Sequence, residues 1–294
     1  MTNYHIEKLA SENALVGEGP MWDSGKKVLY WIDIQGKKFW EYNPKTNLNI
    51  LLDEGFFVAG VVPNKKSGLC IATWEGVKIW DRKNKYKWLF SDSYEGKKFK
   101  LNDVIPSPNG DLIGGSAHLD TCTLFNFKKD GNVEIIDDGL GLCNGMGFSP
   151  DLKTFYSTDS LNRQIFKWDY NYEKNSFSNK TELIKIPISL GLPDGMTVDS
   201  EGFIWSAIWH SAMVIRFDPE GVEERRINLP AAQSSSVMFG GENLNELYIT
   251  SASITDPTGV EPKGYDNNLY RGGDLYRIKL DIQGKNEFIT DFNF

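Results

Sequence analysis

Cysteine and histidine are scarce in this 294-residue chain, and their scarcity excludes several kinds of site. There are three cysteines, Cys70, Cys122 and Cys143, and three histidines. Three thiols cannot all pair within one chain, and none of them belongs to a CxxC motif or to a cysteine–histidine cluster of the kind that binds zinc. We therefore expect free, buried thiols and a reducing, cytoplasmic compartment.

Long apolar runs and long basic runs are missing too. No stretch approaches the ~20 consecutive apolar residues of a membrane-spanning helix, and the first residues lack the basic and apolar regions of a secretion signal. The formal net charge of −8 disfavours nucleic acid as a partner, because nucleic-acid binding relies on a basic patch. We expect a soluble monomer or weak dimer that binds a small molecule and neither nucleic acid nor a membrane.

Short strand-like segments separated by turn formers make up most of the sequence. With 28 glycines and 12 prolines, the chain leaves little room for long amphipathic helices. Six segments are rich in β-branched and aromatic residues, as strands are. They span residues 28–34, 68–74, 111–117, 154–160, 203–209 and 246–252.

These six segments lie in matching surroundings, so the sequence is a repeat. The first residues of the six copies, which we call the slot residues, are Glu18, Ala59, Asn102, Asn144, Asp194 and Ser235. Successive slot residues are 41, 43, 42, 50 and 41 positions apart, and a polar insertion at 170–182 explains the widest interval. A period of ~40–50 residues with several short strands per copy is typical of β-propeller blades.

Six copies predict an all-β fold, a six-bladed β-propeller, with residues 1–294 forming a single domain. A β-sandwich would not repeat at this spacing, and a parallel β-helix repeats over much shorter lengths. The two ends of the chain should meet in the last blade, where His5–Leu9 would add an outer strand beside Gly273–Leu280. That closure would remove an exposed sheet edge.

The slot residues also suggest a function. In a propeller the innermost strands run beside a central channel, so side chains at their starts converge on the axis. Four of the six slot residues carry a carboxylate or amide oxygen. Turn preferences explain one or two Asp or Asn residues, but not a glutamate in the same register.

Converging oxygens are costly to bury unless a cation joins them, so we predict one divalent metal ion on the axis. Hard oxygen donors suit Ca²⁺, Mg²⁺ or Mn²⁺, and zinc is compatible with fewer ligands and an open position.

Five motifs, in order along nearly the whole chain, point to a known family. They are LVGEGPMWD at 15–23, LNDVIPSPNGDLIGG at 101–115, CNGMGFSPD at 143–151, LPDGMTVDSEGFIWSA at 192–207, and SSSVMFGG followed by ELYITSAS at 234–253. They resemble the SMP-30/gluconolactonase/luciferin-regenerating-enzyme family, which includes regucalcin and bacterial sugar lactonases. The resemblance implies a six-bladed propeller with one catalytic divalent cation and lactonase activity on aldonolactones.

The resemblance also implies roles for particular residues. Glu18, Asn144 and Asp194 match the family's metal ligands. Asn102 matches an asparagine that touches substrate, and the equivalent position is a ligand in related calcium phosphotriesterases. Animal members have arginine where this chain has Lys100, and glutamate where ungapped counting places Asp120.

Both of these replacements keep the sign of the charge, so we expect Lys100 and Asp120 to bind substrate. Lysine lacks the bidentate fork of arginine, which leaves the choice of sugar open.

Two further side chains are candidates for the mouth of the pocket. His118 lies two residues before Asp120 and is either an ordinary polar loop residue or a contact to a sugar hydroxyl. The nine tryptophans mostly recur at equivalent positions of the repeat, which favours packing between blades. Trp209 is the exception, because it lies near a strand end.

The chemistry expected of such a site is ester hydrolysis. A divalent cation can polarise a lactone carbonyl and lower the pKa of a water, and a neighbouring carboxylate can take the proton of that water. Asp194 is the first choice for this base. The chain has no GxSxG motif and no catalytic triad pattern to support serine chemistry. Two alternatives stay open: a non-catalytic calcium-binding regulator and a metal-dependent phosphotriesterase.

Overall fold

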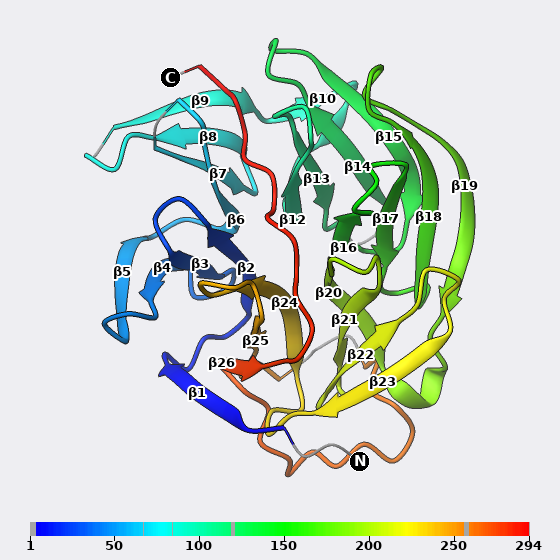
Figure 1. The fold of residues 1–294 in the computed structure, drawn as a ribbon. Helices are drawn as coiled ribbons and strands as arrows, with labels where there is room; N and C mark the ends of the chain where they lie inside the picture. The colour runs from blue at the N-terminus through cyan, green and yellow to red at the C-terminus, as the bar shows by residue number, and fades with distance from the viewer. Residues whose placement is uncertain (1–3, 67, 84, 119–120, 256–258, 294) are drawn as a thin grey trace.

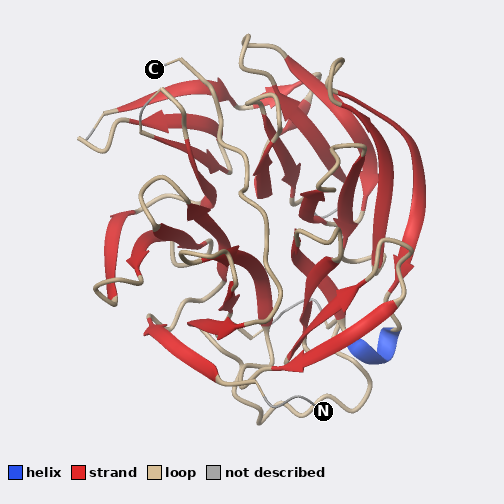
Figure 2. Cartoon of the chain, in the orientation of Figure 1, coloured by secondary structure: helices blue, strands red, loops and turns tan. Residues whose placement is uncertain are grey.

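Six four-stranded antiparallel sheets form a ring in this computed structural model, which describes residues 4–66, 68–83, 85–118, 121–255 and 259–293 (Figure 1). Each sheet is one blade of a propeller. Within the described residues, the helical structure is limited to one 3₁₀ turn, η1 (Ile188–Leu190) (Figure 2). The prediction of an all-β, six-bladed propeller is confirmed.

The first three blades follow one another along the chain. Blade 1 consists of β2 (Gly17–Asp23), β3 (Val28–Asp33), β4 (Lys38–Asn43) and β5 (Leu48–Glu54). Blade 2 consists of β6 (Val58–Pro63), β7 (Leu69–Thr73), β8 (Gly76–Trp80) and β9 (Tyr86–Ser91). A small hairpin of β10 (Ser93–Tyr94) and β11 (Lys97–Lys98) precedes blade 3, which consists of β12 (Leu101–Pro106), β13 (Leu112–Ser116), β14 (Cys122–Phe127) and β15 (Val133–Leu140).

The last three blades repeat the pattern. Blade 4 consists of β16 (Cys143–Phe148), β17 (Thr154–Asp159), β18 (Gln164–Asn171) and β19 (Ser176–Lys185). Blade 5 consists of β20 (Leu192–Val198), β21 (Ile204–Trp209), β22 (Met213–Phe217) and β23 (Glu223–Asn228). Blade 6 consists of β24 (Ser234–Gly240), β25 (Glu246–Ser251), β26 (Asp274–Lys279) and, from the other end of the chain, β1 (Ile6–Ser11).

Burial falls from the axis outward, which explains the composition of the strands. The innermost strand of blade 2, β6, is buried at all six positions, whereas the outermost strand of blade 1, β5, has no fully buried residue. The innermost strands contact one another around the ring in the order β2, β6, β12, β16, β20, β24 and back to β2. Their starts therefore surround one axis, as the repeat predicted.

Aromatic and thiol side chains fill the space between the sheets. Six of the nine tryptophans are buried, and Trp31 and Trp40 stack with their ring centroids 4.4 Å apart. This confirms the expected packing role for most of them, although Trp88 is 48% exposed on an outer strand. All three cysteines are buried and free, which was also predicted.

The ends of the chain close the ring as expected. β1 pairs antiparallel with β26, with Ile6 opposite Ile278, and so forms the outermost strand of blade 6. The polar stretch at 170–182, predicted as an insertion, lies largely in β18 and β19, which pair with each other over their length. The widened repeat thus lengthens the outer hairpin of blade 4.

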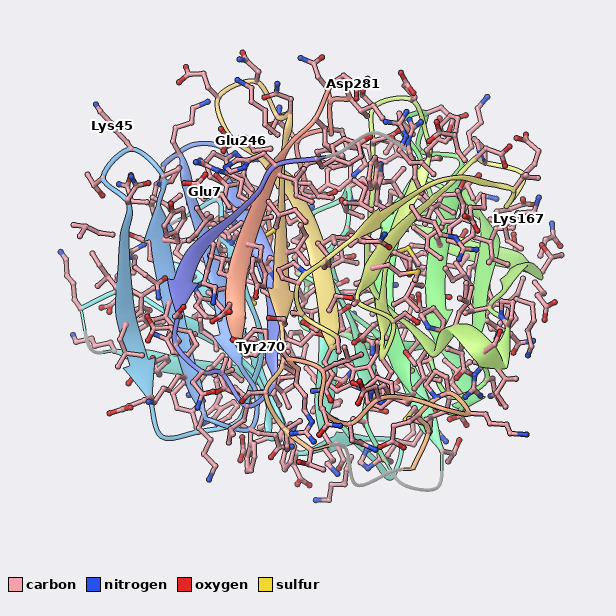
Figure 3. The ribbon with its side chains drawn as sticks, turned by 90° about the horizontal axis from the view of Figure 1, so that it is seen from below. Glu7, Lys45, Lys167, Glu246, Tyr270 and Asp281 are labelled. Atoms are coloured by element: carbon pink, nitrogen blue, oxygen red, sulfur yellow. The ribbon has the colours of Figure 1, made fainter. Side chains whose placement is uncertain are left out.

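The two faces of the ring differ. Figure 3 shows Tyr270, in the β25–β26 connection, at one end of the blade 6 strands, and Glu246 and Asp281 at the other. The C-terminal segment that follows Asp281 crosses the centre of the ring on the face where Glu246 and Asp281 lie (Figure 1). Asn64 of blade 2 fixes it there, because its side chain donates to Phe292 O and accepts from Phe292 N.

No helix in the described residues is long and apolar enough to cross a bilayer.

Candidate active site

Every slot residue lies in or beside a β-bulge. In each blade the pairing between the first two strands shifts register at the slot, so that one or two residues of the inner strand have no direct partner. In blade 3, for example, Leu101 pairs with Ser116 and Asp103 with Gly115, and Asn102 is the extra residue. A bulge bends the strand and changes the direction of its side chains. The repeated bulge therefore brings the slot side chains toward the axis.

In blades 1 and 4 an aspartate at the end of the second strand fixes the approach to the slot. Asp33 accepts hydrogen bonds from the backbone N–H groups of Leu15 and Val16, at 2.8 and 2.9 Å. Asp159 accepts in the same way from Gly141 and Leu142. These bonds hold the backbone just before Glu18 and Asn144, so two slot residues are positioned by the same device.

Glycine allows neighbouring inner strands to come close at the slot. A Cβ at Gly145 would lie 2.5 Å from the carbonyl oxygen of Asp194, and a Cβ at Gly195 would lie 2.0 Å from Oγ of Ser236. The strands that carry Asp194 and Ser236, β20 and β24, are buried along their whole length, so they cannot move aside to make room for a Cβ. The glycine that follows Asn144 and Asp194 thus brings the slots of blades 4, 5 and 6 together.

Four slot residues line one cavity: Glu18, Asn102, Asn144 and Asp194. Three of them are almost fully buried: Glu18 is 6% exposed, Asn144 is 5% exposed and Asp194 is 6% exposed. The Glu18 carboxylate accepts a hydrogen bond from Gly19 N at 2.8 Å, and Nδ2 of Asn102 donates to Cys143 O at 3.0 Å. Oδ1 of Asn144 is buried and accepts no hydrogen bond. The structure thus brings together the three residues expected to bind a metal and the asparagine expected beside them.

The other two slot residues take no part in the cavity. Ala59 has no polar group and is buried. Ser235 uses its hydroxyl within the fold, donating to Gly17 O and lying 3.0 Å from Oγ1 of Thr250. Oxygen donors therefore come from blades 1, 3, 4 and 5.

Burial and neighbouring carboxylates destabilise the charged form of Glu18. Burial raises the pKa of Glu18 well above its usual value, and the negative charges of Asp194 and Asp103 raise it further. Burial also raises the pKa of Asp103 to about 7. Like charges that face each other in a buried place call for a cation.

Asp103 is the carboxylate that the sequence analysis missed. It lines the central channel next to Val104 and Ile105, and its Oδ1 accepts a hydrogen bond from Val104 N at 2.7 Å. In a regular strand Asn102 and Asp103 would face opposite sides. The bulge at Asn102 breaks that alternation, so both side chains lie near the axis.

The cavity above the slot has a volume of about 400 Å³, within the range of small-molecule sites. Apolar residues form much of its wall, and Trp74, Trp209, Lys100 and His118 also line it. Lys100 thus lines the cavity beside the slot, and its role in binding substrate stays a prediction. The contribution of Trp74 to the wall was not foreseen. Asp120 lies outside the described residues.

Two of the polar or aromatic wall residues have partners within the protein. Nε2 of His118 lies 2.8 Å from Lys98 O, so the ring donates there in its Nε2–H tautomer. Trp209 packs edge-on against His210, with ring centroids 5.7 Å apart. Both residues reach the cavity, and the hydrogen bond of His118 gives it a structural task as well.

The donor set fits a hard divalent cation. Within the described ranges, no three His, Cys, Asp or Glu side chains form a metal-binding group. The slot offers two carboxylates, from Glu18 and Asp194, and completes the set with amide oxygens. The buried, unsatisfied Oδ1 of Asn144 is the oxygen that such an ion would bind.

The fold and this axial arrangement define the class to which the chain belongs. A family model described as the SMP-30/Gluconolactonase/LRE-like region matches residues 16–253. The chain is a member of that family.

Named relatives agree with this assignment over nearly the whole chain. Pentonolactonase XacC of Haloferax volcanii is 32% identical, covering 97% of this chain and 98% of the relative. Regucalcin of Danio rerio is 30% identical, covering 86% of this chain and 88% of the relative. A solved structure of a luciferin-regenerating enzyme has a TM-score of 0.90 at 27% identity, covering 98% of this chain and 100% of the other.

Proposed function

We propose that this protein is a lactone hydrolase that converts an aldono-lactone to its aldonic acid with the help of one divalent cation. The observation that carries the proposal is the floor of the cavity, where the Glu18 and Asp194 carboxylates lie with the unsatisfied Oδ1 of Asn144. A relative of similar length is a pentonolactonase, which supports a sugar lactone as the substrate class.

Glu18, Asn144 and Asp194 are the residues that would hold the cation. When bound, a divalent cation supplies a Lewis acid for the lactone carbonyl and for the attacking water. Asp194 takes the proton from that water, because its carboxylate lines the cavity floor where the water attacks. Asp194 then gives this proton to the ring oxygen as the lactone C–O bond breaks, so that the products are a hydroxyl group and a carboxylic acid. The acid retains the second proton of the water and releases it to solvent as it ionises.

The walls of the cavity bind and orient the sugar. The hydrogen bond from Nδ2 of Asn102 to Cys143 O fixes that amide, so its Oδ1 can accept from a sugar hydroxyl. Lys100 donates from its ammonium to the lactone oxygens. Leu142 and Leu161 provide apolar surface and reduce the access of water to the sugar.

The direct test measures acid release from a panel of aldono-lactones in a pH-stat, above the spontaneous rate. The panel holds five- and six-carbon lactones, and each is assayed after chelation and after return of Ca²⁺, Mg²⁺, Mn²⁺ or Zn²⁺. We expect hydrolysis that chelation abolishes and at least one cation restores.

Other outcomes would contradict the proposal in distinct ways. Tight cation binding without any excess hydrolysis would favour a calcium-binding regulator. Cation-dependent cleavage of a phosphotriester such as paraoxon, with no lactone turnover, would favour a phosphotriesterase. Lactone hydrolysis that survives complete chelation would retain the substrate and reject the role of the cation.

A further inference from the structure

Four side chains from blades 1 to 3 form a stack beside the cavity. The rings of Phe57 and Trp74 are parallel within 8°, and their centroids lie 3.5 Å apart. The ammonium of Lys37 lies 4.4 Å from the centroid of Phe57, and the ammonium of Lys100 lies 4.9 Å from that of Trp74. The order of the layers is therefore Lys37, Phe57, Trp74, Lys100.

Backbone hydrogen bonds hold both ends of this stack. Gly55 N, two residues before Phe57, donates to Lys37 O at 2.8 Å. Lys100 N donates to Trp74 O at 2.9 Å, and Lys100 O accepts from Ala117 N at 2.9 Å. Lys100 has a φ of 30°, which is unusual for a residue with a side chain and persists only where the surroundings hold it.

The stack determines what Trp74 can contact. Phe57 covers one indole face, and a ring separation of 3.5 Å leaves no space for an ammonium on that side. Lys100 must therefore lie over the opposite face. With both faces covered, Trp74 turns only its edge to the cavity, and a sugar could stack on the indole only by displacing Lys100.

The indole is also the group that the Lys100 ammonium contacts within the described residues. Among the residues that the structure describes, no carboxylate forms an ion pair with this ammonium, which lies over the ring and beside an apolar cavity wall. Attraction between a cation and an aromatic face grows as water is excluded. A ring that attracts the ammonium without neutralising it leaves N–H groups to donate to a ligand.

We propose that Trp74 is a positioning residue that holds the Lys100 ammonium against the lactone-binding cavity, with Phe57 and Lys37 supporting the indole from behind. The inference rests on the proposed lactonase function for its kinetic consequence. Its structural part, the contact between Lys100 and the indole, does not depend on that function.

A spectroscopic experiment tests the contact without any substrate. The Cε protons of Lys100, assigned by their absence in Lys100→Met, should resonate upfield of those of other lysines because of the indole ring current. Trp74→Leu should remove this displacement, and Trp74→Phe should keep part of it. Trp88→Leu is the matched control, because Trp88 lies in the same blade, is 48% exposed and does not touch Lys100. An unchanged Lys100 resonance in Trp74→Leu would overturn the proposal.

A double-mutant cycle tests the consequence for catalysis. Trp74→Leu should raise KM for the best lactone roughly three- to tenfold, the range of one cation–π contact, while kcat and cation affinity stay near wild type. In the Lys100→Met background the same change should have little further effect. If Trp74→Leu raises KM equally in both backgrounds, the indole contacts substrate itself and the positioning role is wrong.

The two experiments separate the failure of this inference from the failure of the proposed function. A wild-type protein that hydrolyses no lactone rejects the function, and the ring-current measurement still decides whether Trp74 holds Lys100. A lactonase in which Trp74→Leu leaves KM unchanged rejects the positioning role alone.

Discussion

The blades of this propeller share one fold but differ at one position. Blades 1, 3, 4 and 5 present Glu18, Asn102, Asn144 and Asp194 to the cavity, whereas blades 2 and 6 have Ala59 and Ser235 at the same bulge. The bulge is common to all six, so it belongs to the architecture. The backbone thus supplies six equivalent places at the axis, and four of them hold a side chain that lines the cavity with a polar oxygen.

The largest effect should come from Asp194→Asn, which keeps one ligand oxygen but removes the proton acceptor. With saturating cation, turnover of the best lactone should fall on the order of 10²-fold or more, as loss of a general base typically does. Occupancy is checked by calorimetry. Asp218→Asn is the control, since it makes the same change in a turn of blade 5 away from the cavity. Full recovery of turnover at saturating cation would make Asp194 a ligand only.

Glu18→Gln should separate cation binding from stability. Loss of one of two ligand charges should weaken cation affinity by about tenfold or more, because affinity follows ligand charge. The chelated variant should unfold no earlier than wild type at pH 8, since burial and the charges of Asp194 and Asp103 already disfavour ionised Glu18. Titration calorimetry and thermal unfolding measure the two effects.

The matched control for this variant is Glu41→Gln, in the same blade. Glu41 pairs with Arg82 at 2.7 Å, away from the cavity. Equal loss of cation affinity in both variants would show that the loss comes from the change in the protein's net charge, and that Glu18 is not a ligand.

Sequence reasoning found the slot because it is a repeat, and a repeat is visible when residues of one kind recur at one spacing. It could not find Asp103, because the bulge that turns Asp103 inward leaves no periodic trace and strand alternation assigns that residue to the other side. The Trp74 stack was hidden for another reason. Its members are separated by up to 63 positions, from Lys37 to Lys100, and only the packing of blades 1, 2 and 3 against one another brings them together.

Asp103→Asn should change the pH dependence of stability in the chelated protein. The pKa of Asp103 is about 7 in the folded protein, against roughly 3.9 in an unfolded chain. The folded state therefore loses stability as pH rises from about 4 to 7, when the buried carboxyl must ionise. The variant should gain melting temperature relative to wild type at pH 8 and show little gain at pH 4. An equal gain at both pH values would exclude ionisation as the cause.

The smallest effect on the site should come from Ser235→Ala, in a blade that gives the cavity no oxygen. Cation affinity and turnover should stay near wild type. Removing the hydroxyl leaves Gly17 O without this donor and should cost about 1–3 kcal/mol in the free energy of unfolding. Chemical denaturation measures the cost, and a large loss of cation affinity would show that blade 6 does take part in the site.

The pairing of β1 with β26 has a consequence for how the molecule is made. On the ribosome β1 is synthesised long before β26, with 271 residues between Ile6 and its partner Ile278. The first five blades use only strands that are adjacent in the chain, so each can assemble as it emerges. Blade 6 alone waits for both ends, and until then β1 keeps an unpaired edge that other chains can bind. The last step of folding is therefore the one that protects the nascent protein from aggregation.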